Sequence, residues 1–184
     1  MALSHYNTVS VTLSLSAAIM SPCSSAIPDS SMDFPYPVAA LLPQSKSMVL
    51  LERVIEAGEA HIVVEVLVRE DGMFSMPEHT VPSWVGLEYM AQAIAAFSGY
   101  HRKCRGEPIG LGFLLGTRLY QCSVGSFPCG TRLQVRAEKI IEAANDMSVF
   151  SCIIEGDNIK ASSQLNVLLP QDSKKFLAGK GKDL

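Results

Sequence analysis

One apolar stretch, residues 83–99, constrains the fold of this chain more than any other. Its residues are apolar nearly all round a helical wheel, which predicts a helix that other elements bury on most sides. Ser83 is the expected N-cap of this helix, and Gly99 or Gly106 is its expected stop. The stretch is too short and too polar to cross a membrane, so we expect it to lie at the centre of a folded domain.

Glu88 is the only charged side chain in that stretch. Burial disfavours the ionised form of a carboxylate, and a carboxylic acid that stays protonated near neutral pH is suited to general acid catalysis. The alternative is that Glu88 faces solvent or answers the positive end of the helix dipole. Gln92 lies one turn further on the same face, where its amide can hydrogen-bond Glu88 or a ligand. Two polar groups on one face of an apolar helix indicate a site.

Apolar and β-branched runs predict two strands before the helix and four after it. The predicted strands are residues 48–56, 61–68, 111–122, 132–142, 147–155 and 160–169. Turn residues separate the last three of them, and two prolines within residues 35–44 favour a short helix or turn before the first. This order predicts an α+β protein in which an antiparallel sheet wraps around one helix.

Composition divides the chain into a folded part and two tails. Residues 1–32 are rich in serine, lack lysine and arginine and show no period, so we expect a disordered extension. A secretory signal is less expected because polar residues interrupt its apolar run, and Met32 is a second candidate for the translation start. Residues 33–170 form the predicted single domain, and the lysines of residues 171–184 indicate a flexible, solvated tail.

Charge and cysteine content narrow the range of partners. A net charge of −3 provides no broad basic field, which argues against nucleic acid as a partner. Five cysteines without CxxC spacing predict free thiols in a reducing cytoplasm. His101 and Cys104 could share a helical face, but one such pair is too few for a zinc site, and we expect no metal. The hydrophobic content of 48% fits an apolar tunnel, a large subunit interface or a plain core.

Several segments resemble a known family. Residues 87–92 resemble the central-helix motif of the hotdog-fold 3-hydroxyacyl-acyl-carrier-protein dehydratases, in which a glutamate is followed by two residues, alanine and glutamine. The longer run 81–92 resembles more narrowly the dehydratase subunits of aryl-polyene biosynthesis, and residues 48–54, 112–118 and 128–130 extend the match over residues 33–170. The resemblance implies a hotdog fold and a homodimer or heterodimer with a site at each subunit interface. It also implies a substrate on acyl carrier protein, with no cofactor.

Dehydration of a 3-hydroxyacyl thioester requires an acid for the leaving hydroxyl, a base for the α-proton and a donor for the thioester oxygen. Glu88 fits the acid, and Gln92 supports it. Backbone N–H groups near Val85 and Gly86 lie in the first turn of the predicted helix, where unpaired donors favour negative charge. The resemblance assigns the carbonyl donor to Gly86, whose missing side chain would let a thioester approach.

The general base is the departure from the family pattern. In the fatty-acid dehydratases a histidine lies in a His-Phe-Pro motif ahead of the helix, whereas here His79 lacks the phenylalanine and is closer to Glu88. The aryl-polyene group commonly has a histidine where this chain has Gln44, which cannot act as a base. Either His79 acts, with Glu88 of a neighbouring subunit, or the usual base is missing and His79 is an ordinary exposed loop residue.

Two alternatives accompany the prediction of a dehydratase. A hotdog thioesterase would use a carboxylate on the same helix to direct water at the thioester. A non-catalytic acyl-binding or heterodimer partner subunit would explain Gln44. The basic residues of 100–106 either complement the helix dipole or dock an acidic carrier protein.

Overall fold

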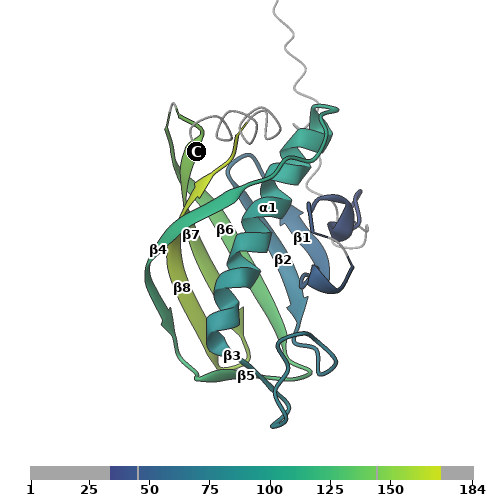
Figure 1. Cartoon of the computed structure of the whole chain (residues 1–184), viewed down its shortest axis with the longest axis vertical. Coiled ribbons are helices and arrows are strands. Elements are labelled where there is room, and N and C mark those ends of the chain that lie inside the picture. The colour runs from purple at the N-terminus through teal and green to yellow at the C-terminus, as the bar shows by residue number, and fades with distance from the viewer. Residues whose placement is uncertain (1–33, 45, 144, 171–184) are drawn as a thin grey trace, which may run out of the picture.

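The computed structural model describes residues 34–44, 46–143 and 145–170, so the expectations for residues 1–32 and 171–184 lie outside the described residues. Within the described part, one sheet of six antiparallel strands has the order β1-β2-β6-β7-β8-β4 and curves around a single α-helix (Figure 1). The predicted α+β architecture is therefore confirmed. The helix is α1 (Gly86–Cys104), and the strands of the sheet are β1 (Arg53–Ala57), β2 (His61–Leu67), β4 (Phe113–Cys122), β6 (Arg132–Glu142), β7 (Met147–Gly156) and β8 (Ile159–Leu168).

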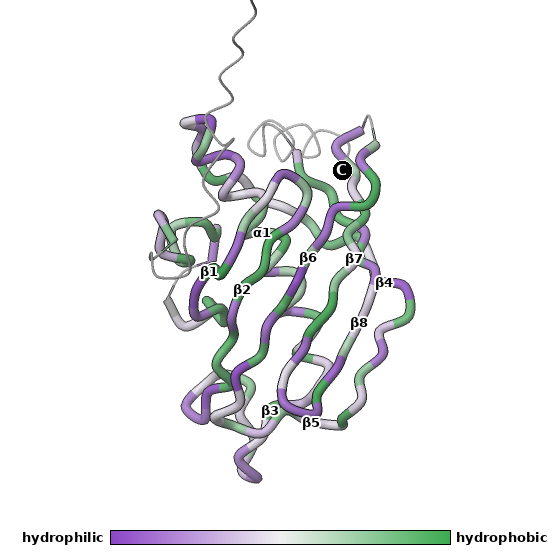
Figure 2. Tube along the Cα trace, turned by 180° about the vertical axis from the view of Figure 1, so that it is seen from behind, coloured by the Kyte–Doolittle hydropathy of each residue, from purple (hydrophilic) through white to green (hydrophobic). Residues whose placement is uncertain are grey.

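The long strands have the period of two that buries one face of a sheet. Residues of β6, β7 and β8 alternate between buried and more exposed positions, and the buried ones face α1. In Figure 2 the same alternation is visible as hydrophobic and hydrophilic residues along β6. The predicted bounds of β6 are correct, and those of β2, β4, β7 and β8 are correct to within two residues.

Two three-residue strands were not predicted. β3 (Thr80–Pro82) pairs with β5 (Ser126–Pro128) in a separate two-stranded sheet beneath the start of α1 (Figure 1). Strands this short carry no measurable period, so the sequence offers no signal for them. The pair is important for the site because it fixes the point at which the chain enters the helix.

The entry to α1 differs from the expected cap. A 3-10 turn, η3 (Ser83–Val85), runs directly into α1, and neither Pro82 before the turn nor Val85 before the helix makes a side-chain capping bond. The N–H of Gly86 instead donates to the carbonyls of Ser83 and Trp84. The prediction of Ser83 as the N-cap is therefore wrong, because the tighter turn supplies backbone acceptors in place of a side chain.

The C-terminal part of α1 shows which of the two expected glycines, Gly99 or Gly106, ends the helix. Gly99 lies inside the helix, where an added Cβ would come within 2.0 Å of the Leu41 carbonyl oxygen. Gly106 follows the last turn with a φ of 70°, which is the left-handed conformation that ends helices. Gly99 is thus a close-approach residue, because the segment after η1 (Val38–Ala40) packs its backbone directly on the helix.

The predicted first strand begins later than expected. Residues 46–48 form a 3-10 turn, η2 (Lys46–Met48), and β1 starts only at Arg53. Among the described cysteines, Cys122, Cys129 and Cys152 are free, as expected.

Candidate active site

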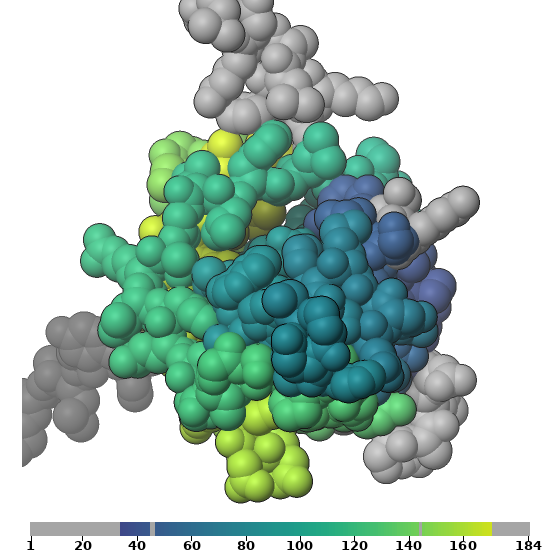
Figure 3. Space-filling view, turned by 60° about the horizontal axis from the view of Figure 1, so that its bottom comes forward, coloured from purple at the N-terminus to yellow at the C-terminus, as the bar shows by residue number. Residues whose placement is uncertain are grey.

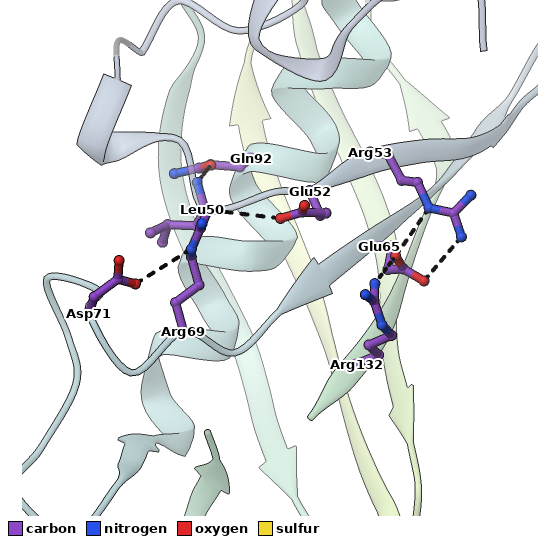
Figure 4. Close-up of polar contacts among 8 residues, drawn as sticks. All are labelled: Leu50, Glu52, Arg53, Glu65, Arg69, Asp71, Gln92 and Arg132. Atoms are coloured by element: carbon purple, nitrogen blue, oxygen red, sulfur yellow. Dashed lines mark hydrogen bonds and ion pairs between the residues drawn. The ribbon is translucent and has the colours of Figure 1, made fainter. Parts of the chain in front are cut away.

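Gln92 is the polar centre of the site. Its side chain is fully buried on α1 and makes three hydrogen bonds, of which Figure 4 shows the one with Leu50. The amide oxygen accepts from the Leu50 N–H at 2.9 Å, and the amide nitrogen donates to the Met48 carbonyl at 2.8 Å and to Glu88 Oε1 at 2.9 Å. These bonds explain why residues 48–50 are not part of β1. Gln92 holds that segment against the helix and fixes the Glu88 carboxylate at the same time.

Glu88 lies in the first turn of α1 and is half-buried. One carboxylate oxygen accepts the bond from Gln92, and Oε2 has no hydrogen-bond partner among the described residues. Residues 86–99 of α1 are all buried or half-buried, as expected, whereas Trp84, which lies in η3 one turn before Glu88, is 60% exposed. A carboxylate that is oriented through one oxygen and open at the other can exchange a proton with a ligand on that exposed side.

Gly86 is required by packing inside the subunit. A Cβ at this position would lie 2.4 Å from the Tyr120 hydroxyl and 3.3 Å from Phe127 Cζ. The Tyr120 hydroxyl donates to the Ser83 carbonyl at 2.5 Å, which ties β4 to the start of the helix. The side-chain position of Gly86 therefore faces the sheet, and its N–H already donates to two carbonyls. Val85, the other expected donor, has a fully buried side chain.

His79 lies apart from the Glu88 and Gln92 pair. Its side chain is 73% exposed, and Nδ1 is 2.5 Å from Glu70 Oε1 in the loop between β2 and β3. His79 has a φ of 56°, and its carbonyl accepts from the Cys129 N–H at 2.9 Å, so the backbone is anchored while the ring faces out. Figure 3 views the end of the molecule that carries this loop, drawn in blue to teal. No hydrogen bond joins His79 and Glu88 in the described part of the chain.

The other two described histidines have partners elsewhere. His61 Nε2 is 2.7 Å from Glu56 Oε1, between β1 and β2. His101 Nε2 lies 3.2 Å from the Gly58 carbonyl, and burial lowers the pKa of its ring. His101 is 13 residues beyond Glu88 on the same helix, a separation of about 20 Å along the axis. Within the described residues, this chain brings no histidine to Glu88.

The basic residues of 100–106 are largely paired internally. Arg102 donates to the Pro170 carbonyl at 2.7 Å, and Arg105 makes two bonds to the Glu107 carboxylate at 2.8 and 3.0 Å. The Arg105 guanidinium holds the pKa of Glu107 below its ordinary value. A polar cavity of about 910 Å³ beside these residues is lined by four carboxylates as well as by cations. This arrangement supports helix-end pairing rather than an open anion site.

Two residues of the site were missed from sequence. Tyr120 follows a bulge in β4, where Leu119 has a φ of 48°, and no spacing in the sequence marks that contact. Tyr89 stands between Glu88 and Met90 in the helix motif, but it passes as an ordinary core residue. Only the structure shows that it lines a cavity next to the segment held by Gln92.

Two further features are absent from the described residues. No helix there combines the length and hydropathy needed to cross a bilayer. No three or more histidine, cysteine, aspartate or glutamate side chains in the same ranges are grouped closely enough to hold a metal ion.

Comparisons with known proteins identify the family to which this chain belongs. Residues 36–178 match the model of the ApeP-like family, described as ApeP dehydratase. The chain is similar to a solved structure from Xenorhabdus doucetiae, "The Dehydratase Heterocomplex ApeI:P", with 32% identity and a TM-score of 0.71 over 78% of this chain and 97% of that one. A search of curated protein sequences finds no match.

More distant structures share the fold alone. One is the sigma28-regulated virulence protein Cj0977 of Campylobacter jejuni, with 12% identity and a TM-score of 0.50 over 73% of this chain and 89% of that one. Another is a hypothetical thioesterase with coenzyme A from Streptococcus pneumoniae, with 10% identity and a TM-score of 0.50 over 64% of this chain and 84% of that one. From the family model and the similarity to the ApeI:P structure, the chain belongs to the ApeP-like dehydratase family of the hotdog fold.

Proposed function

We propose that this chain removes water from a 3-hydroxyacyl thioester carried on acyl carrier protein and yields the trans-2-enoyl thioester. The observation that carries the proposal is the Glu88 carboxylate, which Gln92 orients through Oε1 while Oε2 stays open. The step needs no redox cofactor, because dehydration involves no net oxidation or reduction.

Glu88 acts as the general acid. In its protonated form it gives its proton to the hydroxyl on C3, the C3–O bond breaks, and water leaves. A base removes the proton from C2, and the electron pair of that C–H bond forms the C2–C3 double bond. Gln92 cannot titrate, so its role is to hold the acid in place.

The thioester oxygen needs a hydrogen-bond donor while the α-proton is removed. The first turn of α1, near Val85 and Gly86, is the proposed donor because the positive end of the helix dipole lies there. Since the Gly86 N–H already donates to the carbonyls of Ser83 and Trp84, it would share or exchange those bonds when a thioester binds.

The base comes from across a subunit boundary. Within the described residues no histidine contacts Glu88, and His79 is exposed at a loop tip with Glu70 as its partner. An exposed histidine on an anchored backbone suits a site shared with a carboxylate of a neighbouring subunit, in which the histidine removes the substrate's α-proton, and Glu88 in turn would share its site with a base from that subunit. The ApeI:P structure is a heterocomplex by its own description, so we propose an ApeI-type hotdog subunit as the neighbour.

The edge of the sheet offers a surface for that neighbour. β4 is an edge strand, and four of its leucines or those just before it are strongly exposed: Leu111, Leu114, Leu115 and Leu119. Trp84 adds an exposed aromatic side chain at the start of α1. Exposed apolar edges are sites of pairing with another chain, which supports assembly through β4.

The test is incubation with 3-hydroxyacyl acyl carrier protein, with mass spectrometric detection of water loss. The full chain is assayed alone and mixed with an ApeI-type subunit. We expect enoyl product from the mixture. His79→Ala tests the source of the base. The substitution should lower the rate of the mixture if His79 is the base beside the neighbour's carboxylate, and should leave the rate unchanged if the neighbour alone supplies the base. Release of free acid would instead identify a thioesterase. A mixture that stays fully active when Glu88 is replaced by glutamine would identify a non-catalytic partner subunit.

A further inference from the structure

Tyr120 lies where the sheet meets the start of α1. It belongs to β4, the edge strand, and its hydroxyl donates a hydrogen bond of 2.5 Å to the Ser83 carbonyl in η3. The hydroxyl also lies against Gly86, because a Cβ added there would come within 2.4 Å of it. Tyr120 thus contacts both the turn that precedes the helix and the residue whose N–H is the proposed donor to the thioester oxygen.

A bulge in β4 turns Tyr120 toward the helix. Arg118 pairs with Gln164 and Gln121 pairs with Ser162, so β4 holds one residue more than β8 between these two pairs. Leu119 lies in that interval with a φ of 48°, which is uncommon for a leucine. Bulges re-aim side chains and are frequent beside active sites. Here the extra residue places the Tyr120 ring on the face of the sheet that packs against the start of α1.

The hydrogen bond between Tyr120 and Ser83 has a fixed direction. A carbonyl oxygen can only accept, and burial raises the pKa of the Tyr120 phenol, so the hydroxyl keeps its proton over the range in which enzymes work. The Ser83 carbonyl therefore has a permanent donor. A carbonyl oxygen has two lone pairs, and the second donor to this one is the Gly86 N–H.

The Gly86 N–H is held weakly by its two acceptors. It is shared between the carbonyls of Ser83 and Trp84, and such shared bonds in a 3-10 turn have poorer geometry than those inside an α-helix. An oxygen that already accepts from a phenol is also a weaker acceptor for a second donor, because the first donor draws electron density from it. The Gly86 N–H can therefore transfer to another oxygen at a low cost.

We propose that Tyr120 is a positioning residue for the oxyanion donor: by occupying the Ser83 carbonyl, its hydroxyl keeps the Gly86 N–H available to the thioester oxygen. This inference rests on the proposed function, which assigns that donor to the first turn of α1. Tyr120 acts through Gly86, contacts no reacting atom and exchanges no proton.

The test is Tyr120→Phe, which removes the hydroxyl and keeps the ring. The Ser83 carbonyl would then accept from Gly86 alone, so the Gly86 amide proton should move downfield and exchange more slowly with solvent. NMR on the full chain labelled with ¹⁵N-glycine measures both. In the mixture with an ApeI-type subunit, kcat for water loss should fall about 3- to 10-fold with KM unchanged, because the donor is needed only as negative charge develops.

Two further proteins serve as controls. 3-Fluorotyrosine at position 120 keeps the hydroxyl and makes it a stronger donor, so the Gly86 amide proton should move upfield and kcat should not fall. Tyr100→Phe removes the hydroxyl of a half-buried tyrosine at the far end of α1, whose ring packs on Phe34, and should change neither measurement. Circular dichroism and the melting temperature show whether each variant is folded.

The outcomes separate this proposal from the proposed function. The role of Tyr120 is rejected when the Gly86 amide proton of Tyr120→Phe does not move downfield, or when it moves and kcat stays at the unaltered value. A rise in KM alone also rejects it. An unaltered mixture that forms no enoyl product rejects the proposed function, and the amide measurement then decides the competition for the Ser83 carbonyl by itself.

Discussion

At the scale of single residues, Gln92 links the fold to the chemistry. Its three hydrogen bonds satisfy two backbone groups of residues 48–50 and orient Glu88. Sequence spacing predicts the Glu88 and Gln92 pair, because residues four apart share a helix face. The two backbone partners were beyond prediction, since nothing local in residues 48–50 indicates an amide 42 or more positions away.

Gln92→Leu keeps the volume of the side chain and removes all three bonds. The Leu50 N–H and the Met48 carbonyl would then be left without partners, and we expect a loss of about 2–4 kcal/mol in the free energy of unfolding. Urea denaturation measures this. Gln164→Leu, at an exposed position of β8, is the matched control and should change stability by less than about 0.5 kcal/mol. Equal effects of the two substitutions would contradict the role of Gln92.

Glu65 is a buried carboxylate whose ionised form is stabilised by two arginines. Arg53 lies 3.1 Å away and Arg132 2.6 Å away (Figure 4), and hydrogen bonding to Arg53 is the largest cause that lowers the pKa of Glu65. Because the folded pKa lies below the unfolded one, this stabilisation is present above the ordinary carboxylate range, about pH 4.3, and is lost as pH falls through the lowered pKa.

Glu65→Gln should therefore be less stable than the unaltered chain at pH 7, and the difference should shrink below about pH 4. Thermal unfolding at a series of pH values measures it. Glu155→Gln removes a 64% exposed carboxylate of β7 whose ion pair with Lys160 is on the surface, and should show little such dependence. A pH-independent difference for Glu65→Gln would count against the ion-pair account.

At the scale of elements, the strands were predictable and the junctions were not. β6 and β8 have clear alternation, which sets their bounds in the sequence. The entry to α1 depends on η3 and on Tyr120, which reaches it from β4, so the capping pattern of Ser83 was misleading. Glycine often ends helices, yet Gly99 lies inside α1, where its missing side chain leaves room for the backbone of Leu41.

Gly99→Ala tests that close approach. The new Cβ meets backbone atoms that cannot rotate away, so we expect a loss of about 2–3 kcal/mol, in the range of overpacked cores. Calorimetry should show a lower melting temperature. Gly125→Ala has no atom within 4 Å of the added carbon and serves as the control. An unchanged melting temperature for Gly99→Ala would show that the segment after η1 moves freely from the helix.

At the scale of the whole molecule, the described chain would supply half of the proposed site. It holds the Glu88 carboxylate through one oxygen, leaves the other oxygen open and exposes apolar residues along an edge strand. The fold and the family were predictable from the helix motif, whereas the source of the base was not, because residues of the proposed neighbouring subunit would leave no trace in this sequence.

Leu114→Glu and Leu119→Glu together should break assembly with an ApeI-type subunit. Each places a charge on the exposed edge of β4, and we expect at least about tenfold weaker association for each, measured by light scattering after gel filtration. Ile141→Glu, on β6 and 55% exposed, is the control and should leave the complex intact. A complex that survives the β4 changes would place the partner elsewhere.

The central claim is that Glu88 is the acid of the reaction, and Glu88→Gln tests it most directly. The variant is mixed with an ApeI-type subunit, and the rate of water loss from 3-hydroxyacyl acyl carrier protein is measured by mass spectrometry beside the same mixture with Glu78→Gln. We predict a fall of about 10²- to 10⁴-fold for Glu88→Gln and no more than a small change for Glu78→Gln. Water loss at the unaltered rate with Glu88→Gln would contradict the claim.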